Sequence, residues 1–345
     1  MTEADMDMRA GTNIENHEDL FRYLKDSGRI APEERPVAET LTGGISNRTV
    51  LMRRSSSEAW VLKQALEKLR TTVEWFSDPR RIEREARGME ALGRWLPEGS
   101  VPRLIFLDEK NHILAMEAVP EPHRNWKDLL LESPPSDAHI AGFAALLAAL
   151  HRNSASDPEA AKTFADRSFF ETLRLEPYYG YAAEQVPESA YFLRQLIVVT
   201  RRTARGVVHG DFSPKNILIR GDRLVLLDHE VIHFGDTAFD VGFSLTHLLS
   251  KAHHFRERRA VFAQAALRYW SLYLEAAGPA ASVPEFREAC VRHTLGCLLA
   301  RVAGRSPLEY LNHEERLEQG AAVTALISSP PRGIPELIES FLQRV

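Results

Sequence analysis

The segment that most constrains the fold of this chain is residues 207–228, VVHGDFSPKNILIRGDRLVLLD. A Gly221-Asp222 pair separates two mainly aliphatic runs, 217–220 and 223–227, and this pattern predicts a β-hairpin. A two-residue turn would place the residue before the first strand opposite the last residue of the second. The segment therefore predicts two antiparallel strands whose open end lies next to the preceding loop.

Three polar residues lie around the open end of this hairpin. Asp211 is in the preceding loop, and Asn216 and Asp228 follow it by five and seventeen residues. Amide and carboxylate oxygens are ligands that Mg²⁺ prefers, and a further carboxylate can orient or accept the proton of a hydroxyl group. We therefore predict a magnesium–phosphate site at Asn216 and Asp228, with Asp211 as the base beside it.

The residues His209–Asn216, HGDFSPKN, also have the H-G-D-x-x-x-x-N spacing. This segment resembles the catalytic loop of the aminoglycoside phosphotransferase-like kinases, small-molecule relatives of the protein kinases. Asp228-His229-Glu230 stands where protein kinases have D-F-G, which is also similar to the small-molecule branch. The resemblance implies a protein-kinase-like α+β fold. Its small antiparallel β lobe would carry one main helix, and its larger lobe would be mainly helical.

Four further motifs, in chain order, resemble the nucleotide-binding half of the same family. Thr42–Asn47 (TGGISN) resembles its phosphate-covering loop, and Trp60–Lys63 (WVLK) resembles the strand with the phosphate-binding lysine. Glu85 resembles the helix glutamate that pairs with this lysine, and His112–Val119 the strand that leads into the hinge. The resemblance implies ATP and Mg²⁺ as cofactors. The implied nucleotide-binding residues are Gly43, Gly44, Ser46, Asn47, Lys63, Glu85, Glu117 and Ala118.

Four other polar residues of the catalytic segment have roles that are not settled by the pattern. Glu230 could reach the metal through a water molecule or cap local backbone groups. We expect His209 to pin the loop and Lys215 to face solvent, although Lys215 could also stabilise the transferred phosphate. Asp240 precedes a helical run and is suited to N-capping. In the family such an aspartate braces the catalytic loop, so we expect it to be structural.

The order of apolar and polar residues predicts two lobes. Residues 1–15 are polar and expected to be disordered, 16–119 to form the nucleotide-binding lobe, and 120–345 the catalytic and acceptor-binding lobe. In the first lobe, helices are expected over 16–27 and 79–95, and strands over 37–41, 49–53, 59–63, 101–108 and 112–119. In the second lobe, helices are expected over 140–151, 240–252, 256–276, 283–303, 312–328 and 334–343, while 168–200 is mixed.

Composition argues against several classes of partner. Lys+Arg 43 against Asp+Glu 48 gives a formal net charge of −5, which does not indicate a nucleic-acid or anionic-membrane partner. The apolar stretch Phe143–Leu150 is too short to span a bilayer, and the acidic N-terminus lacks the apolar core of a secretory signal. Cys290 and Cys297 are about 10 Å apart along an expected helix, too far for an unstrained disulfide. We expect a cytoplasmic protein with two buried thiols.

The expected acceptor is a hydroxyl group of a small molecule, and its class stays open. A polycationic aminoglycoside would need carboxylates. Glu309, Glu314, Glu315 and Glu318 offer them, although Arg301, Arg305 and Arg316 lie among them. A choline-type acceptor would need an aromatic cage, for which the candidates are Tyr269, Trp270 and Tyr273. Their spacing is more typical of one buried helical face, and sugar-like acceptors fit equally well.

Two other functional classes are disfavoured by the motifs. A nucleotide-binding regulatory protein with weak catalysis would not need the complete set of Lys63, Asp211, Asn216 and Asp228. A protein kinase would be expected to carry D-F-G and an A-P-E-type segment, which this sequence lacks. The motifs therefore favour a small-molecule kinase.

Overall fold

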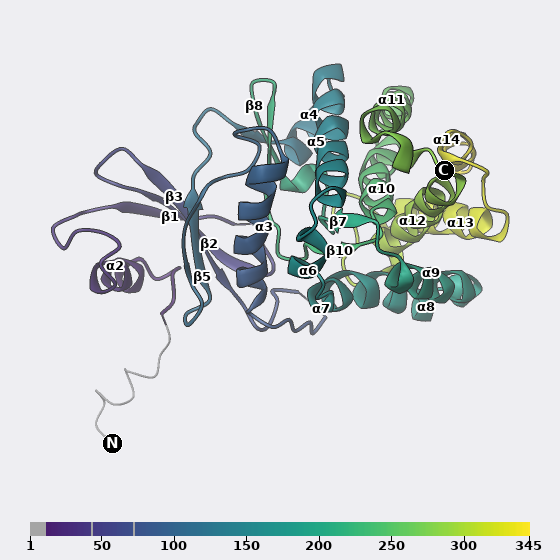
Figure 1. Ribbon diagram of the computed structural model, residues 1–345. Coiled ribbons are helices and arrows are strands. Elements are labelled where there is room, and N and C mark those ends of the chain that lie inside the picture. Colours follow the sequence, from purple (N-terminus) through teal and green to yellow (C-terminus); the bar gives the residue numbers. More distant parts are fainter. Residues whose placement is uncertain (1–11, 43, 72) are drawn as a thin grey trace. The chain divides into compact units, whose positions relative to one another are not determined.

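The computed structural model describes residues 12–42, 44–71 and 73–345 (Figure 1). The chain forms two compact units. One consists of Met1–Ala91 with Pro102–Pro120, and the other of Leu92–Val101 with Glu121–Val345. The first is built on a β-sheet and the second is mainly helical, so the α+β class predicted from the motifs is confirmed. The assignment of 16–119 to nucleotide binding and of 120–345 to catalysis and acceptor binding stays a prediction.

The first unit contains an antiparallel sheet of five strands in the order β1-β2-β3-β5-β4. All five predicted strands are present, with shifted ends. The fourth starts three residues later than predicted, because Pro102 has no backbone N–H to donate to a neighbouring strand. The bounds are β1 (Val37–Thr40), β2 (Asn47–Arg53), β3 (Ala59–Ala65), β4 (Leu104–Asp108) and β5 (Ile113–Glu117).

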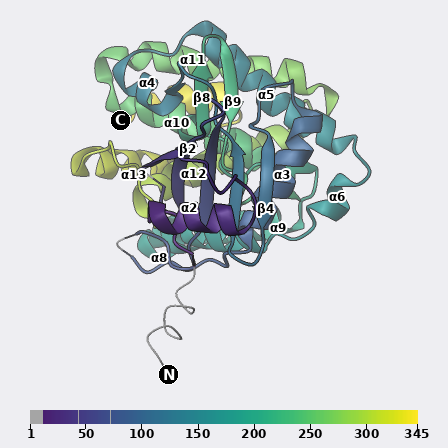
Figure 2. The same cartoon turned by 90° about the vertical axis from the view of Figure 1, so that its left-hand side faces the viewer.

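Helix α2 (His17–Asp26) lies across this sheet (Figure 2). Its first turn is capped by Asn16, whose side chain accepts from the backbone N–H groups of the second and third helical residues. Leu20 and Leu24 are fully buried in one core with apolar side chains of β2, β3 and β5. Ile14 joins this core, so residues 12–15 are packed rather than disordered, and residues 1–11 lie outside the described residues.

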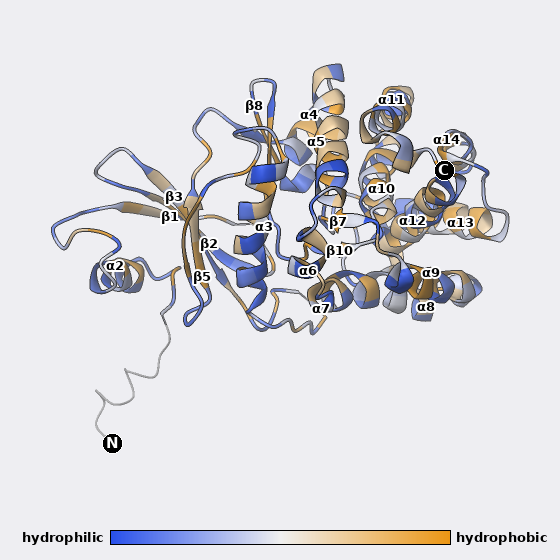
Figure 3. Cartoon of the chain, in the orientation of Figure 1, coloured by the Kyte–Doolittle hydropathy of each residue, from blue (hydrophilic) through white to orange (hydrophobic). Residues whose placement is uncertain are grey.

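Helix α3 (Arg81–Trp95) starts in the first unit and ends in the second. It begins two residues later than predicted. Asp78 precedes it, and the Asp78 side chain accepts a hydrogen bond of 2.9 Å from the backbone N–H of Arg80. Ile82, Ala86 and Met89 are buried, and the opposite face carries charged residues (Figure 3). This amphipathic pattern separates the packed face of α3 from its exposed face.

The predicted hairpin is present in the second unit. Strands β8 (Ile217–Arg220) and β9 (Arg223–Leu226) pair in the expected register, with Arg220 opposite Arg223. The backbone N–H of Leu227 donates to the carbonyl of Asn216 at 2.9 Å, which closes the open end of the hairpin. The hairpin is extended by β6 (Arg124–Asn125), and β7 (Gly206–Val208) pairs separately with β10 (His233–Gly235).

Helices make up most of the second unit. The six predicted helices are confirmed, and the mixed region 168–200 proves to be helical, including a π-helix, η1 (Glu171–Gly180), that contains Pro177. Helix α10 packs against α11 and α12, and α5 packs against α11. The longer helices are α4 (Trp126–Glu132), α5 (Asp137–Ala155), α9 (Ala190–Arg202), α10 (Ala238–His254), α11 (Arg259–Ala277), α12 (Pro284–Ala303), α13 (His313–Ser328) and α14 (Ile334–Leu342).

Both cysteines lie on α12 and are free, buried thiols, as predicted. Burial raises the pKa of the Cys297 thiol to about 12. None of the helices in the described part of the chain has the length and apolar character needed to cross a membrane.

Candidate active site

The loop between β7 and β8 is held from below by Asp240 in the first turn of α10. The Asp240 carboxylate accepts from the backbone N–H of His209 at 2.7 Å and from that of Gly210 at 2.8 Å. His151 adds a third contact at 3.2 Å. Burial raises the pKa of Asp240, but the hydrogen bond and charge of His151 outweigh it and the pKa is lowered. Asp240 thus braces the loop, as the family resemblance implied. It does not cap the helix, because it lies inside the first turn.

His209 is a structural residue of this loop, as predicted. It is fully buried, and its Nδ1 accepts from the backbone N–H of Asp211 at 3.2 Å. The proton therefore lies on Nε2, which donates to Nδ1 of His229 at 3.1 Å. Burial lowers the pKa of His209, which favours the neutral ring. The ring therefore holds the loop in place through hydrogen bonds.

Gly210 must be glycine for the loop to turn. Its φ is +79°, and a Cβ at this position would lie 2.8 Å from Cγ2 of Val231. The next side chain, Phe212, stacks on Phe143 of α5 at 4.5 Å, and the Phe212 carbonyl accepts from the Ser244 hydroxyl at 3.0 Å. The loop is thus anchored to α5 and α10 on both sides of Asp211.

Asp211 and Asn216 are hydrogen-bonded to each other. Nδ2 of Asn216 donates to Oδ2 of Asp211 at 2.7 Å and to the Asp211 carbonyl at 3.0 Å. The same Oδ2 lies 2.9 Å from Nη2 of Arg174, in η1. Oδ1 of Asp211 and Oδ1 of Asn216 make no hydrogen bond within the described residues 12–42, 44–71 and 73–345. Asp211 thus presents one carboxylate oxygen, and Asn216 presents its amide oxygen.

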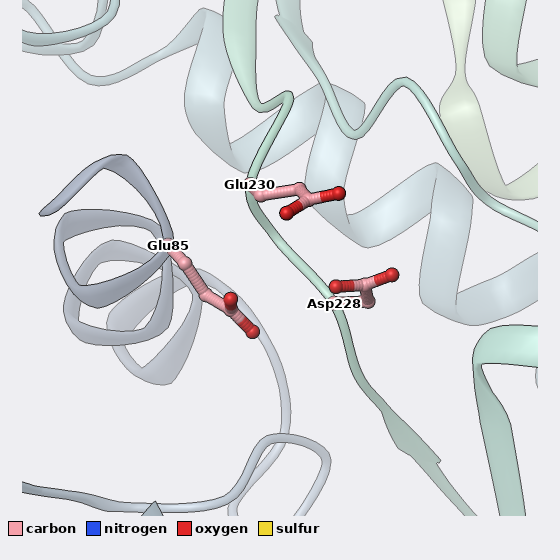
Figure 4. A group of neighbouring side chains, drawn as sticks. All are labelled: Glu85, Asp228 and Glu230. Carbon is pink, nitrogen blue, oxygen red and sulfur yellow. The ribbon is translucent and has the colours of Figure 1, made fainter. Parts of the chain in front are cut away.

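Asp228 and Glu230 follow β9 on one segment, and carboxylate oxygens of the two lie within 4.8 Å of each other (Figure 4). Asp228 has a φ of +66°, a left-handed conformation that aspartate tolerates better than most residues. Such a conformation costs about 1–3 kcal/mol and is typical of functional sites. Glu230 is buried, which agrees with either of its two predicted roles.

In the first unit Lys63 and Glu85 form the predicted ion pair. Nζ of Lys63 on β3 lies 2.6 Å from Oε1 of Glu85 on α3. Lys63 is in the middle of the sheet, between Thr49 and Leu114 of the flanking strands. The side chains are 11% and 1% exposed, so the pair is held in one geometry. The sequence motif identified both partners correctly, although they are 22 residues apart.

The loop before β2 is fixed by a buried arginine that the sequence motif did not indicate. Arg81 of α3 donates to the carbonyl of Leu66 at 2.8 Å and to the carbonyl of Ser46. Nδ2 of Asn47 donates to the Ser46 hydroxyl at 3.1 Å. Gly44 is exposed next to these residues, and Gly43 lies outside the described residues. Ser46 and Asn47 therefore form a rigid base for the loop.

The two residues predicted at the hinge end of β5 use their backbone N–H groups within the sheet. The backbone N–H of Glu117 donates to the carbonyl of Arg103, and that of Ala118 to the carbonyl of Ala59, each at 2.9 Å. The Glu117 side chain is about half exposed and paired with Arg103. A nucleotide contact at these residues would therefore involve other atoms than these N–H groups.

A sequence model of the phosphotransferase enzyme family matches residues 37–281, which include the sheet, the Lys63–Glu85 pair and the whole Asp211 loop. The chain belongs to this phosphotransferase family. No curated protein sequence matches it.

Solved structures extend the likeness to almost the whole chain. A choline/ethanolamine kinase family protein from Mesorhizobium loti is 15% identical, with a TM-score of 0.56 over 95% of this chain and 99% of that one. The amicoumacin kinase hAmiN, in complex with AMP-PNP, Ca²⁺ and Ami, is 12% identical, with a TM-score of 0.58 over 94% and 98%. A macrolide 2'-phosphotransferase from Brachybacterium faecium is 17% identical, with a TM-score of 0.50 over 90% and 98%. The shared fold confirms the predicted kinase-like architecture of this phosphotransferase.

The residues considered for acceptor binding have structural partners instead. Tyr269, Trp270 and Tyr273 are buried, and Tyr273 hydrogen-bonds to His151 at 2.8 Å, so they are a core face of α11 and not a cage. Among the carboxylates, Glu315 caps α13 and Glu318 pairs with Arg256 at 2.9 Å. Arg305 pairs with Glu176 at 3.1 Å. Burial therefore argues against the aromatic cage, whereas the Glu309 side chain is 61% exposed and Glu314 is exposed too, so the class of acceptor stays open.

Proposed function

We propose that this phosphotransferase moves the γ-phosphate of ATP to a hydroxyl group of a small molecule. The observation that carries the proposal is the Asp211–Asn216 hydrogen bond of 2.7 Å in the anchored loop. This bond directs Nδ2 of Asn216 toward Asp211, so the amide oxygen of Asn216 is available to a metal. Oδ1 of Asp211 is available to a hydroxyl group. The names of the structural neighbours, which are kinases of small molecules, support the same class of acceptor.

The residues at this site suit Mg²⁺, which favours a few protein oxygens together with the phosphates of the substrate. Asn216 and Asp228 would hold the ion, and Glu230 is near enough to Asp228 to support it. When bound, Mg²⁺ neutralises negative charge on phosphate oxygens. Lys63, fixed by Glu85, would neutralise charge on the α- and β-phosphates, while Gly43, Gly44, Ser46 and Asn47 would cover them. Glu117 and Ala118 would border the nucleotide base.

Asp211 would orient the acceptor hydroxyl and take its proton as transfer proceeds. An aspartate is a weak base, but the transition state of phosphoryl transfer is loose, so the hydroxyl proton leaves late and orientation matters most. The ion pair with Arg174 and the hydrogen bond from Asn216 fix Oδ2, and thereby the direction of Oδ1.

Two measurements test this proposal. Calorimetry of ATP binding should show much tighter binding with Mg²⁺ than without it, and Asp228→Ala should abolish the difference; equal affinity in wild type would refute the metal assignment. ADP release with and without a panel of small hydroxyl compounds should show stimulation by at least one compound. Stimulation only by proteins, or ATP binding without turnover, would instead support a protein kinase or a regulatory protein.

A further inference from the structure

Helix α10 carries a stripe of polar residues although it is buried on all sides. Residues 238–253 are all buried, and Asp240, Ser244, His247 and Lys251 recur at helical spacing on one face. The first two of these residues bind the catalytic loop, at Gly210 and at the Phe212 carbonyl. The stripe therefore starts at the Asp211 loop and continues into the interior of the second unit.

Lys251 is the most unusual member of this stripe. It is 0% exposed, and its Nζ has no hydrogen-bond partner among the described residues. Its Nζ lies over the face of the Tyr310 ring, 4.8 Å from the centroid. Burial lowers the pKa of Lys251 to about 7, opposed by Glu309 and reinforced by Lys127 and Arg301. A buried amine without a partner is costly, so packing alone gives no reason for it.

Three residues near Lys251 also have a buried polar atom without a hydrogen-bond partner. Nε2 of His247 and Oη of Tyr310 are buried and have no hydrogen-bond partner within the described part of the chain. Nε of Arg301 also has none there, although Nη1 of Arg301 donates to the Tyr178 hydroxyl at 3.1 Å and to the Ser306 hydroxyl at 3.0 Å. The pKa of His247 is lowered well below its usual value by burial and by nearby cations, in order Arg301, Lys251, Lys215 and Lys127. The cationic side chains that act electrostatically on His247 belong to the Lys215 loop and to α4, α10 and α12.

Two carboxylates, Glu309 and Glu315, act electrostatically on this cluster, and both are already paired. Oε1 of Glu315 lies 2.9 Å from Nδ1 of His254. Oε1 of Glu309 lies 2.8 Å from Nζ of Lys127, and the Glu309 side chain is 61% exposed. Each unpartnered atom in the cluster can donate a hydrogen bond. A group of donors with excess positive charge is complementary to an anion, and it repels a cationic ligand.

We propose that Lys251, His247, Arg301 and Tyr310 bind an anionic group, a carboxylate or a phosphate, of the acceptor molecule. This inference rests on the proposed function, because the acceptor hydroxyl is the group placed at Asp211. The proposed acceptor is opposite in charge to aminoglycosides and choline. Ser244 contacts the Asp211 loop, and Lys251 lies about 10 Å further along the helix at 1.5 Å per residue. The acceptor is therefore a compact hydroxy compound with its anionic group several bonds from the reacting hydroxyl.

The test compares probes that share a hydroxylated chain and differ in charge. Gluconate and glucose 6-phosphate are titrated calorimetrically into the full chain, alongside neutral glucose and cationic glucosamine. We expect one or both anionic probes to bind at least about tenfold more tightly than glucose and glucosamine. The anion that binds better identifies a carboxylate or a phosphate as the preferred group. No preference for either anion would overturn the inference.

Two variants separate the cluster from general surface charge. Lys251→Met keeps the length of the side chain and removes its charge, so it should weaken binding of the preferred anion about tenfold or more. Lys162→Met removes an exposed lysine of α6 (Ala160–Thr163) and should leave this affinity within twofold. Equal anion affinity in Lys251→Met and wild type would contradict the assignment.

The wild-type pH profile gives a measurement that needs no variant. Gluconate stays ionised between pH 6 and 8.5, so a fall in its affinity over this range reports loss of the Lys251 proton. If a phosphate probe is preferred, its affinity is compared only over a pH range in which its own charge is constant. We expect binding to weaken as pH rises through about 7, and a flat profile would contradict a role for Lys251. Mg²⁺-dependent ATP binding is measured in the same samples. Normal ATP binding without anion preference overturns only this inference, whereas anion binding without ATP binding overturns the proposed function.

Discussion

Arg174 and Asp211 form a buried ion pair, with Nη2 of Arg174 2.9 Å from Oδ2 of Asp211. Nε of Arg174 also donates to the Gly210 carbonyl at 2.8 Å, so one guanidinium binds both the carboxylate and the backbone of the loop. Burial alone would lower the pKa of Arg174, but Asp211 and other nearby acidic groups raise it above its usual value. The arginine therefore stays charged and fixes the carboxylate of the proposed base.

This relationship predicts that Arg174 is a positioning residue for transfer. Arg174→Met should lower kcat by at least tenfold and leave ATP affinity nearly unchanged, because the loop loses its clamp while Asn216 and Asp228 stay. Arg174→Lys keeps the charge but cannot make both contacts, so it should recover part of the turnover. Steady-state kinetics of both variants, with ATP binding by calorimetry, provide the measurement.

A matched control distinguishes this role from a general loss of stability. Removing one partner of a buried ion pair can cost about 3–5 kcal/mol, so the unfolding free energy of each variant must be measured. Arg201→Met breaks a more exposed ion pair, with Glu171 at the start of η1, and should change neither turnover nor stability by much. Normal turnover in a folded Arg174→Met protein would show that Asp211 does not need the clamp.

Lys63 gives a second prediction, on the nucleotide side. Lys63→Ala should lower turnover far more than stability, because the role proposed for its ion pair with Glu85 is to place an ammonium group at the phosphates. Lys68→Ala is a suitable control, since Lys68 is exposed and its ion pair is with the exposed Glu74. A Lys63→Ala protein that transfers phosphate at the wild-type rate would mean that the strand carries a different lysine, or none.

Asp240 should determine the acid stability of the loop. Its pKa is lowered in the folded chain, so its charge contributes stability that is present above the unfolded value of about 3.9 and is lost as pH falls through the folded value. Asp240→Ala leaves the amides of His209 and Gly210 and the ring of His151 without this partner, at about 1–3 kcal/mol for each group. We therefore expect a loss of several kcal/mol at neutral pH, measured by urea unfolding.

The same experiment at low pH tests the sign of this effect. Between about pH 5 and pH 2 the wild-type protein should lose more stability than Asp240→Ala, because the variant no longer carries the carboxylate that becomes protonated. Identical slopes for the two proteins would show that the Asp240 charge does not contribute.

The parts of the site that the sequence predicted correctly are those set by local spacing. The hairpin follows from Gly221-Asp222 between two strands, and the Lys63–Glu85 pair follows from two short motifs on a strand and a helix. Arg174 was not predicted because it reaches Asp211 across 37 residues, from a π-helix whose sequence contains Pro177 and shows no regular helical period.

Tertiary packing explains the other differences from expectation. Asp240 stands near a helix start, where its position alone suggests capping. Its carboxylate is used instead by the loop that packs against that turn, which only the family resemblance implied. Lys251 ends an apolar run in a segment with several histidines, which is typical of a helix end exposed to solvent. It is buried because α10 is enclosed by neighbouring helices, and no local pattern reports that enclosure.

The most direct test of the central claim is single-turnover phosphate transfer by Asp211→Asn, measured together with ATP binding. The substitution keeps the size of the side chain and removes its charge, and help from a general base is typically worth about 10²–10⁴-fold. We predict that transfer to the acceptor falls by at least this lower factor while the affinity for ATP with Mg²⁺ changes little. Transfer within a few-fold of wild type would contradict the assignment of Asp211 as the residue on which transfer depends.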